Sequence, residues 1–194
     1  MCDIIVISKL KGDAPMVYMF LADGFEEIEA LCPLDLLRRA GVEVTTVGVG
    51  KDVIRGSHGI TVFADIPDVM YRDASPEMII LPGGMPGAAN LDACKAVDAA
   101  LKAASRKGAY IAAICAAPFV LGKRGLLEDK RAVCYPGFED ELIGAHVDKE
   151  LTVVRDGNII TAKGMGAAFE FGLELVRCLC DDEAADKIRA SVFG

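Results

Sequence analysis

The sequence has no tryptophan, only two histidines and no Cys-x-x-Cys pair. A structural zinc site is therefore not expected, and we expect neither a metal ion nor another cofactor. No run of Lys and Arg exceeds two residues and the net charge is -8, so a stable nucleic-acid partner is not expected. The uncharged stretch 108–122 contains Pro118 and is shorter than the roughly 18–20 apolar residues of a spanning helix, so no membrane segment is predicted.

What the sequence does have is a large apolar fraction. Hydrophobic residues make up 53% of its 194 residues, which excludes a disordered chain and suits one domain with a sizeable core. The seven cysteines are odd in number and scattered, which is typical of reduced thiols and predicts a cytoplasmic protein. We expect residues 1–15 to be an N-terminal extension, or the product of an early start codon, before a single domain over 16–194.

Short apolar runs alternate with segments of helical periodicity. Strands are predicted at 17–21, 42–49, 60–63, 78–81, 110–114, 131–135, 151–155 and 158–162. Helices are predicted at 25–40, 91–107, 116–123, 167–180 and 183–192. Continuous apolar strands between helices predict an α/β three-layer sandwich, with a mostly parallel sheet and helices on both faces. Ligands of such sheets bind beyond the carboxyl ends of the strands, so the residues directly after each strand are the candidates.

Cys115 directly follows one predicted strand and precedes a helix, which is the position of a nucleophile elbow. The helix N-terminus is expected to favour its thiolate. The alternative is a small buried cysteine without reactivity. Gly83 and Gly84 follow another strand and would let backbone N–H groups approach an oxyanion, although a plain tight turn fits the same residues.

Three glutamates lie in the first turn of the helix after the first strand. Glu26 and Glu27 are interpreted as ordinary partners of the helix dipole. Glu29 lies on the flank of the apolar stripe, where burial would raise its pKa and suit it to general acid–base catalysis. A solvated carboxylate is the alternative for Glu29.

These motifs together resemble the ThiJ/PfpI superfamily, in the branch of the parkinsonism-associated protein deglycase and its small bacterial relatives. The resemblance runs in the family's order over residues 16–194. It is carried by Ala22-Asp23-Gly24-Phe25-Glu26-Glu27-Ile28-Glu29, Leu36-Leu37-Arg38-Arg39-Ala40-Gly41, Leu81-Pro82-Gly83-Gly84, Ala112-Ala113-Ile114-Cys115-Ala116-Ala117-Pro118 and Phe169-Glu170-Phe171.

The resemblance implies a flavodoxin-like sandwich, similar to class I glutamine amidotransferases, that forms homodimers. It implies that Cys115 is the nucleophile, that Glu29 is its protonated partner, and that Gly84 and the Ala116 N–H form an oxyanion site. The activities it implies are cofactor-free conversion of methylglyoxal to lactate (glyoxalase III), deglycation of glyoxal-modified molecules, chaperone action and oxidative-stress sensing.

The sequence departs from the family pattern at three places. Tyr135 stands where the related deglycase has a histidine before proline, and His58 stands where relatives often have an arginine beside the site. His58 is a candidate pocket residue, with a surface loop histidine as the alternative. Met165 replaces proline in a Gly-Pro-Gly segment that reaches the partner's site. A peptidase of this superfamily has histidine directly after the cysteine, and an amidotransferase needs a later His-x-Glu; the sequence has neither.

Two functions from different classes fit these residues. The first is an enzyme acting on small α-oxoaldehydes through a hemithioacetal on Cys115, with Glu29 as general acid and base. The second is a redox-sensing stress protein or chaperone in which Cys115 is oxidised and little catalysis occurs. Both functions require Cys115 and Glu29 to meet at one end of the sheet.

Overall fold

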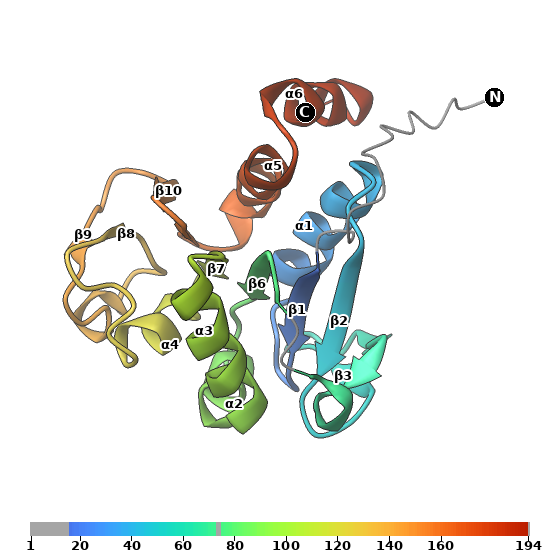
Figure 1. Ribbon diagram of the computed structural model, residues 1–194, viewed down its shortest axis with the longest axis vertical. Helices are drawn as coiled ribbons and strands as arrows, with labels where there is room; N and C mark the ends of the chain where they lie inside the picture. Colours follow the sequence, from blue (N-terminus) through green and yellow to red (C-terminus); the bar gives the residue numbers. More distant parts are fainter. Residues whose placement is uncertain (1–15, 73–74, 194) are drawn as a thin grey trace.

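The computed structural model describes residues 16–72 and 75–193 (Figure 1). The expectation for residues 1–15 therefore lies outside the described part of the chain. Within those ranges no helix is both long and apolar enough to cross a membrane.

One seven-stranded sheet forms the centre of the molecule, in the order β10-β11-β7-β6-β1-β2-β5. All neighbouring strands are parallel except β10, which pairs antiparallel with β11 at one edge. The strands are β1 (Val17–Leu21), β2 (Val44–Gly48), β5 (Ile66–Pro67), β6 (Met78–Leu81), β7 (Tyr110–Ile114), β10 (Val153–Asp156) and β11 (Ile159–Ala162). The predicted mostly parallel sheet is confirmed.

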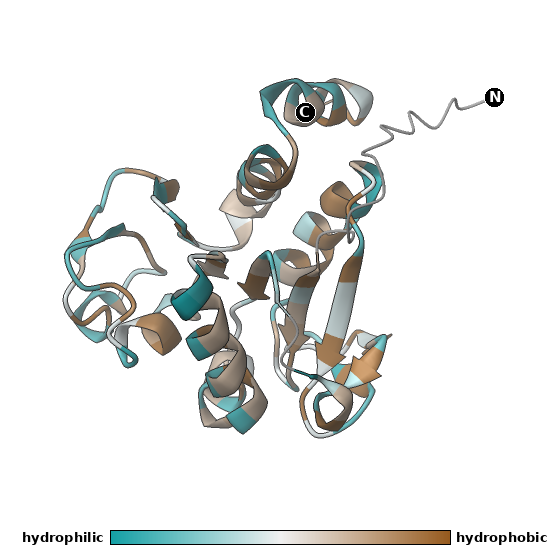
Figure 2. Cartoon of the chain, in the orientation of Figure 1, coloured by the Kyte–Doolittle hydropathy of each residue, from teal (hydrophilic) through white to brown (hydrophobic). Residues whose placement is uncertain are grey.

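Helices pack on both faces of this sheet, which confirms the three-layer sandwich. One face carries α1 (Glu27–Arg39), α5 (Ala168–Leu179) and α6 (Asp182–Ser191), and the other carries α2 (Gly87–Ala93), α3 (Lys95–Lys107) and α4 (Pro118–Gly122). Successive side chains of β6 enter opposite cores, since Ile80 packs with α1 and α5 while Ile79 packs with α2 and α3. The central strand β6 is accordingly hydrophobic along its length (Figure 2).

Several predicted elements are shorter or divided. The helix expected over 91–107 is two helices, because Cys94 has extended backbone and serves as the N-cap of α3. The strand expected at 60–63 is β4 (Thr61–Phe63), which pairs with β3 (Val53–Arg55) in a separate hairpin rather than in the main sheet.

The strand expected at 131–135 is reduced to β8 (Arg131–Ala132), paired with β9 (His146–Val147). Three 3-10 helices complete the described elements, η1 (Asp68–Met70), η2 (Glu139–Glu141) and η3 (Met165–Ala167).

The carboxyl ends of β1, β6 and β7 lie side by side because these strands are neighbours in the sheet. Two backbone hydrogen bonds join the loops that follow β1 and β6: the Glu26 N–H donates to the Gly83 carbonyl at 3.0 Å, and the Gly87 N–H donates to the Gly24 carbonyl at 3.2 Å. The start of α1 is thereby fixed beside the loop after β6, and the site is built at this edge.

Candidate active site

Cys115 occupies a sharp turn between β7 and α4. Its φ of 66° is in the left-handed region, which a non-glycine residue adopts only when the surrounding structure enforces it. The Cys115 N–H donates to the Ala162 carbonyl at 2.8 Å, which ties the turn to the end of β11. The residue is partly exposed. These are the features of the predicted nucleophile elbow.

Glu29 comes from the first turn of α1 and is 1% exposed. Its Oε2 accepts a hydrogen bond from the Gly83 N–H at 3.1 Å, and its carboxyl group is hydrogen-bonded to the Cys115 thiol. The structure therefore decides between the two interpretations of Glu29: the side chain is buried and in contact with the cysteine. It contacts Cys115 because α1 lies on the same face of the sheet as the cysteine side chain.

Gly83 and Gly84 make room for this pair. A Cβ atom on Gly83 would lie 2.5 Å from the Cys115 Cβ and 2.5 Å from the Glu29 Oε2, so no larger residue fits. Gly84 has a φ of 85° and its α-carbon packs against the backbone at the start of α1. The N–H groups of Gly84 and Ala116 are directed at the Cys115 sulfur. Two such donors can stabilise an oxyanion that forms on a carbon bonded to that sulfur.

Both groups of the pair hold their protons more tightly than usual. Burial raises the pKa of Glu29 from 4.5 to about 7, with a smaller contribution from the charge of Glu26. Burial, and after it the neighbouring Glu29 carboxylate, raise the pKa of the Cys115 thiol to about 12. The two N–H donors on the sulfur act in the opposite direction but do not outweigh these effects.

Burial of the sulfur and the nearby Glu29 carboxyl group therefore act against the thiolate that the helix N-terminus is expected to favour. The helix after Cys115, α4, has only five residues, so its dipole is small compared with the cost of burying a charge beside a carboxylate. The pair consists of the Cys115 thiol and the Glu29 carboxyl group, which can act as a base toward it. Glu29 is positioned to accept the Cys115 proton when the sulfur forms a bond.

Tyr135, the residue in the family's histidine position, lies beside Cys115. Its N–H donates to the Cys115 carbonyl at 2.8 Å, and its side chain is about half exposed. Its ring packs against Gly164, the residue before η3. The ring therefore forms part of the wall around Glu29 and Gly164.

His58 is bound to the glutamates that precede Glu29. Its Nδ1 lies 3.1 Å from the Glu27 Oε2 and 3.3 Å from the Glu26 Oε2, and its side chain is 71% exposed. The hydrogen bond with Glu27 raises the pKa of His58 above its usual 6.5, helped by the charge of Glu26. His58 thus lies at the start of α1, one helical turn from Glu29, in an exposed loop.

Glu27 has a role that the sequence interpretation missed. It is 3% exposed, and its Oε1 accepts the N–H groups of His58 at 2.8 Å and Ile60 at 3.3 Å. A Cβ on Gly56 would lie 2.3 Å from that same oxygen, so the glycine permits the close approach. Glu27 therefore holds the loop between β3 and β4 against α1. Its position in a helical first turn gave no signal of this contact.

The described residues contain one group with the composition and spacing to hold a metal ion. It consists of Glu26, Glu27 and His58, whose ligand atoms all lie within 4.8 Å of one another. Cys115 is not part of this group, and its sulfur is engaged with Glu29 and the two N–H donors.

Fold and site together define a class of protein, an α/β sandwich in which a cysteine at a strand end faces a buried carboxyl group. Residues 15–178 match the model of the DJ-1/PfpI family. The chain belongs to that family.

Curated relatives agree with this assignment. The chain is 37% identical to the Parkinson disease protein 7 homolog of Danio rerio, over 90% of this chain and 95% of that protein. It is 34% identical to Deglycase PYRAB04690 of Pyrococcus abyssi, over 84% of this chain and 98% of that protein. It is also 36% identical to Protein DJ-1 homolog B of Arabidopsis thaliana, where it spans 42% of the longer protein.

Solved structures show the same fold. The structure of oxidized Toxoplasma gondii DJ-1 superposes with a TM-score of 0.89 at 38% identity, covering 93% of this chain and 98% of that one.

Proposed function

We propose that the protein is a cysteine-dependent, cofactor-free enzyme acting on small α-oxoaldehydes, with methylglyoxal converted to lactate as the model reaction. The observation that carries the proposal is the hydrogen-bonded pair of Cys115 and buried Glu29 below two converging N–H groups. A nucleophile, a base with a pKa of about 7 and an oxyanion site are the groups that such a reaction requires.

The first step is attack of the Cys115 sulfur on the aldehyde carbon. A carbon–sulfur bond forms while Glu29 accepts the thiol proton, and the aldehyde oxygen becomes an oxyanion held by the N–H groups of Gly84 and Ala116. Return of the proton to that oxygen gives a neutral hemithioacetal. Because Glu29 then has its carboxylate back, it can act as a base again.

The second step moves a proton between the two carbons of the substrate. Glu29 removes the hydrogen of the hemithioacetal carbon to give an enediol and returns a proton to the neighbouring carbon. The product is a thioester of a 2-hydroxy acid on Cys115. Water then cleaves the carbon–sulfur bond, which releases the 2-hydroxy acid and restores the thiol. The sequence consumes one water molecule, leaves the oxidation state of the protein unchanged and needs no oxidant or reductant.

Deglycation of glyoxal-modified proteins or nucleotides belongs to the same proposal. An adduct of this kind presents a hemiaminal carbon at the oxidation level of an aldehyde, which the same nucleophile and base can process. The 34% identical relative named as a deglycase supports this extension.

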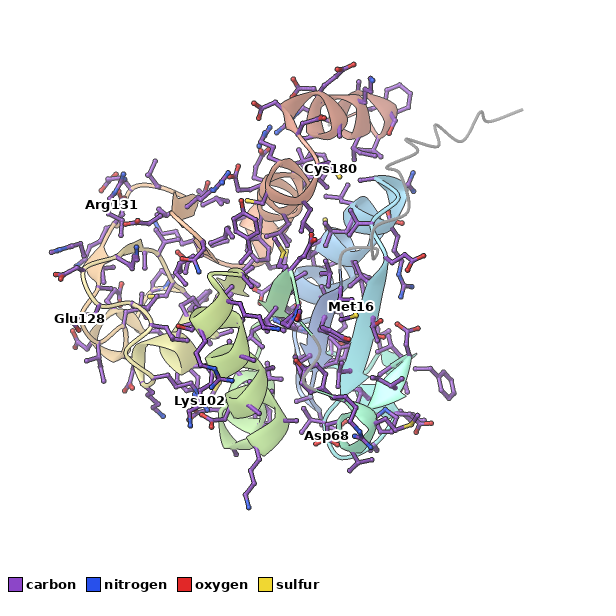
Figure 3. All side chains as sticks on the ribbon, viewed as in Figure 1. Met16, Asp68, Lys102, Glu128, Arg131 and Cys180 are labelled. Atoms are coloured by element: carbon purple, nitrogen blue, oxygen red, sulfur yellow. The ribbon has the colours of Figure 1, made fainter. Side chains whose placement is uncertain are left out.

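The test is methylglyoxal loss and lactate formation by the wild type and by Cys115→Ala and Glu29→Gln. We expect both variants to lose at least about a hundredfold in kcat/KM, which is typical of removing a general base or nucleophile. Cys180→Ser is the matched control, because Cys180 is an exposed cysteine at the α5–α6 junction (Figure 3). Equal rates in the wild type and the three variants would end the proposal.

A redox-sensing or chaperone role is the second candidate. A partly exposed cysteine whose sulfur faces two N–H donors could hold the oxygens of a sulfinate, and the similar Toxoplasma gondii protein is described as oxidized. Mass spectrometry after mild peroxide treatment tests it. Gain of two oxygens at Cys115 alone, together with slow aldehyde turnover, would favour the sensor over the enzyme.

We also propose that the protein is a homodimer in the cytoplasm. Support comes from the β3–β4 hairpin, on which Ile60 and Phe63 are 53% and 78% exposed, since exposed apolar groups on one element favour association. Light scattering of the wild type and Phe63→Glu tests the assembly. A monomeric wild type would contradict it.

A further inference from the structure

Gly164 is a glycine whose backbone does not require one. It follows β11 and precedes η3, and its φ of 162° and ψ of -169° are an extended conformation that any residue adopts. Gly164 is also buried. The reason for a glycine here must therefore be the space beside its α-carbon.

That space lies between two residues of the active site. A Cβ on Gly164 would lie 3.2 Å from the Cδ2 of the Tyr135 ring and 3.9 Å from the Glu29 Oε1. Nearby Gly166 is different, because a Cβ there would meet nothing within 4 Å. Only at the first of these two glycines would a methyl group press on the Tyr135 ring and approach the Glu29 carboxyl group.

The α-carbon of Gly164 faces the Glu29 carboxyl oxygen that does not accept the Gly83 N–H. Oε2 of Glu29 accepts the Gly83 N–H, while Oε1 is the oxygen nearest to Gly164. The Tyr135 ring forms the opposite wall, and its backbone is tied to the Cys115 carbonyl. The backbone that carries this wall is therefore tied directly to the backbone of Cys115.

We propose that Gly164 and Tyr135 limit the size of the group that can lie beside Glu29 in a Cys115 adduct. This inference rests on the proposed function in one respect. In an α-oxoaldehyde, the group whose size is limited is the substituent on the ketone carbon. Glu29 must reach that carbon to deliver a proton to it, so the substituent has to lie beside Glu29. The site then takes small aliphatic α-oxoaldehydes and discriminates against bulky ones.

The first experiment compares substrates of increasing substituent size, namely glyoxal, methylglyoxal and phenylglyoxal, in wild type, Gly164→Ala and Gly166→Ala. The added methyl group in Gly164→Ala is expected to lower kcat/KM for methylglyoxal about tenfold relative to glyoxal, the usual effect of one methyl group on pocket discrimination. Gly166→Ala should keep the wild-type ratio. Tyr135→Ala should act in the opposite direction and raise the relative kcat/KM for phenylglyoxal.

A second experiment tests the size limit by chemical labelling, which does not require catalytic turnover. Cys115 is alkylated by iodoacetamide or by 2-bromoacetophenone; in each case sulfur bonds to carbon, the halide leaves and the thiol proton is lost to base. Labelling rates are read by mass spectrometry of the Cys115 peptide. We expect Gly164→Ala to slow the bulky reagent about tenfold while the iodoacetamide rate stays within about twofold. Tyr135→Ala should relatively favour the bulky reagent, which keeps the test valid if Gly164→Ala fails to fold.

The two readouts separate the two proposals. Absence of turnover by the wild type, with a shifted labelling ratio in Gly164→Ala, would end the proposed function and support the size limit. Turnover by the wild type, with unchanged ratios in Gly164→Ala and Tyr135→Ala, would overturn the size limit and leave the proposed function standing.

Discussion

Burial of Glu29 should make the protein less stable as this residue ionises, and Glu29→Gln should remove that cost. The Glu29 pKa of about 7 in the folded protein compares with an ordinary value of 4.5. The folded state therefore binds the Glu29 proton more tightly than the unfolded chain, and stability falls as pH rises from 4.5 to about 7. Below that window both states are protonated, and above it the full penalty applies.

The difference between the two pKa values corresponds to about 3 kcal/mol at 1.36 kcal/mol per unit. A glutamine keeps the oxygen that accepts the Gly83 N–H and places an uncharged amide against the Cys115 sulfur. We expect Glu29→Gln to be more stable than the wild type by about 3 kcal/mol at pH 8, and by less than about 1 kcal/mol at pH 5. The same variant should be inactive, which makes Glu29 a residue whose function costs stability.

Urea unfolding at pH 5 and pH 8 measures these free energies. Glu43→Gln is the control, since Glu43 is exposed and its replacement removes only a surface charge. A Glu29→Gln variant that is destabilised at both pH values, or stabilised equally at both, would refute the argument from burial.

Three further predictions follow from the geometry. Alkylation of Cys115 by iodoacetamide should accelerate in the wild type as pH rises through about 7, where Glu29 becomes able to accept the thiol proton, and this step should be absent from the pH profile of Glu29→Gln. Glu27→Ala should lower the free energy of unfolding by about 1–3 kcal/mol, because it leaves the N–H groups of the 57–60 loop without their buried acceptor; urea unfolding measures it. Gly83→Ala should abolish aldehyde turnover, since its Cβ would overlap Cys115 and Glu29, and a retained rate would contradict the described packing.

The position of Cys115 could be predicted because it depends on local order. A cysteine between a buried strand and a helix must lie at the edge of a parallel sheet, and the structure confirms the turn by its positive φ. The burial of Glu29 could not be decided in the same way. A glutamate on the flank of an apolar stripe is buried only if another element covers it, and the covering residues come from loops that are distant in sequence.

The electrostatic balance at Cys115 could not be predicted for a similar reason. A helix N-terminus is visible in the sequence, but the opposing effects are not: the burial of the sulfur and the charge of a carboxyl group contributed by α1. The contacts of Glu27 and Gly164 could not be predicted from the sequence either, since each is made with a loop from another part of the chain.

The sequence alone determined the alternation of apolar strands and helices, and hence the layered sheet, because hydrophobic periodicity acts over a few residues. It also placed the candidate side chains at strand ends. Only the tertiary structure decided which of these side chains meet, how deeply each is buried and which of them holds the proton. Desolvation and contact depend on what the whole folded chain packs around a group, and neighbours in the sequence do not specify that.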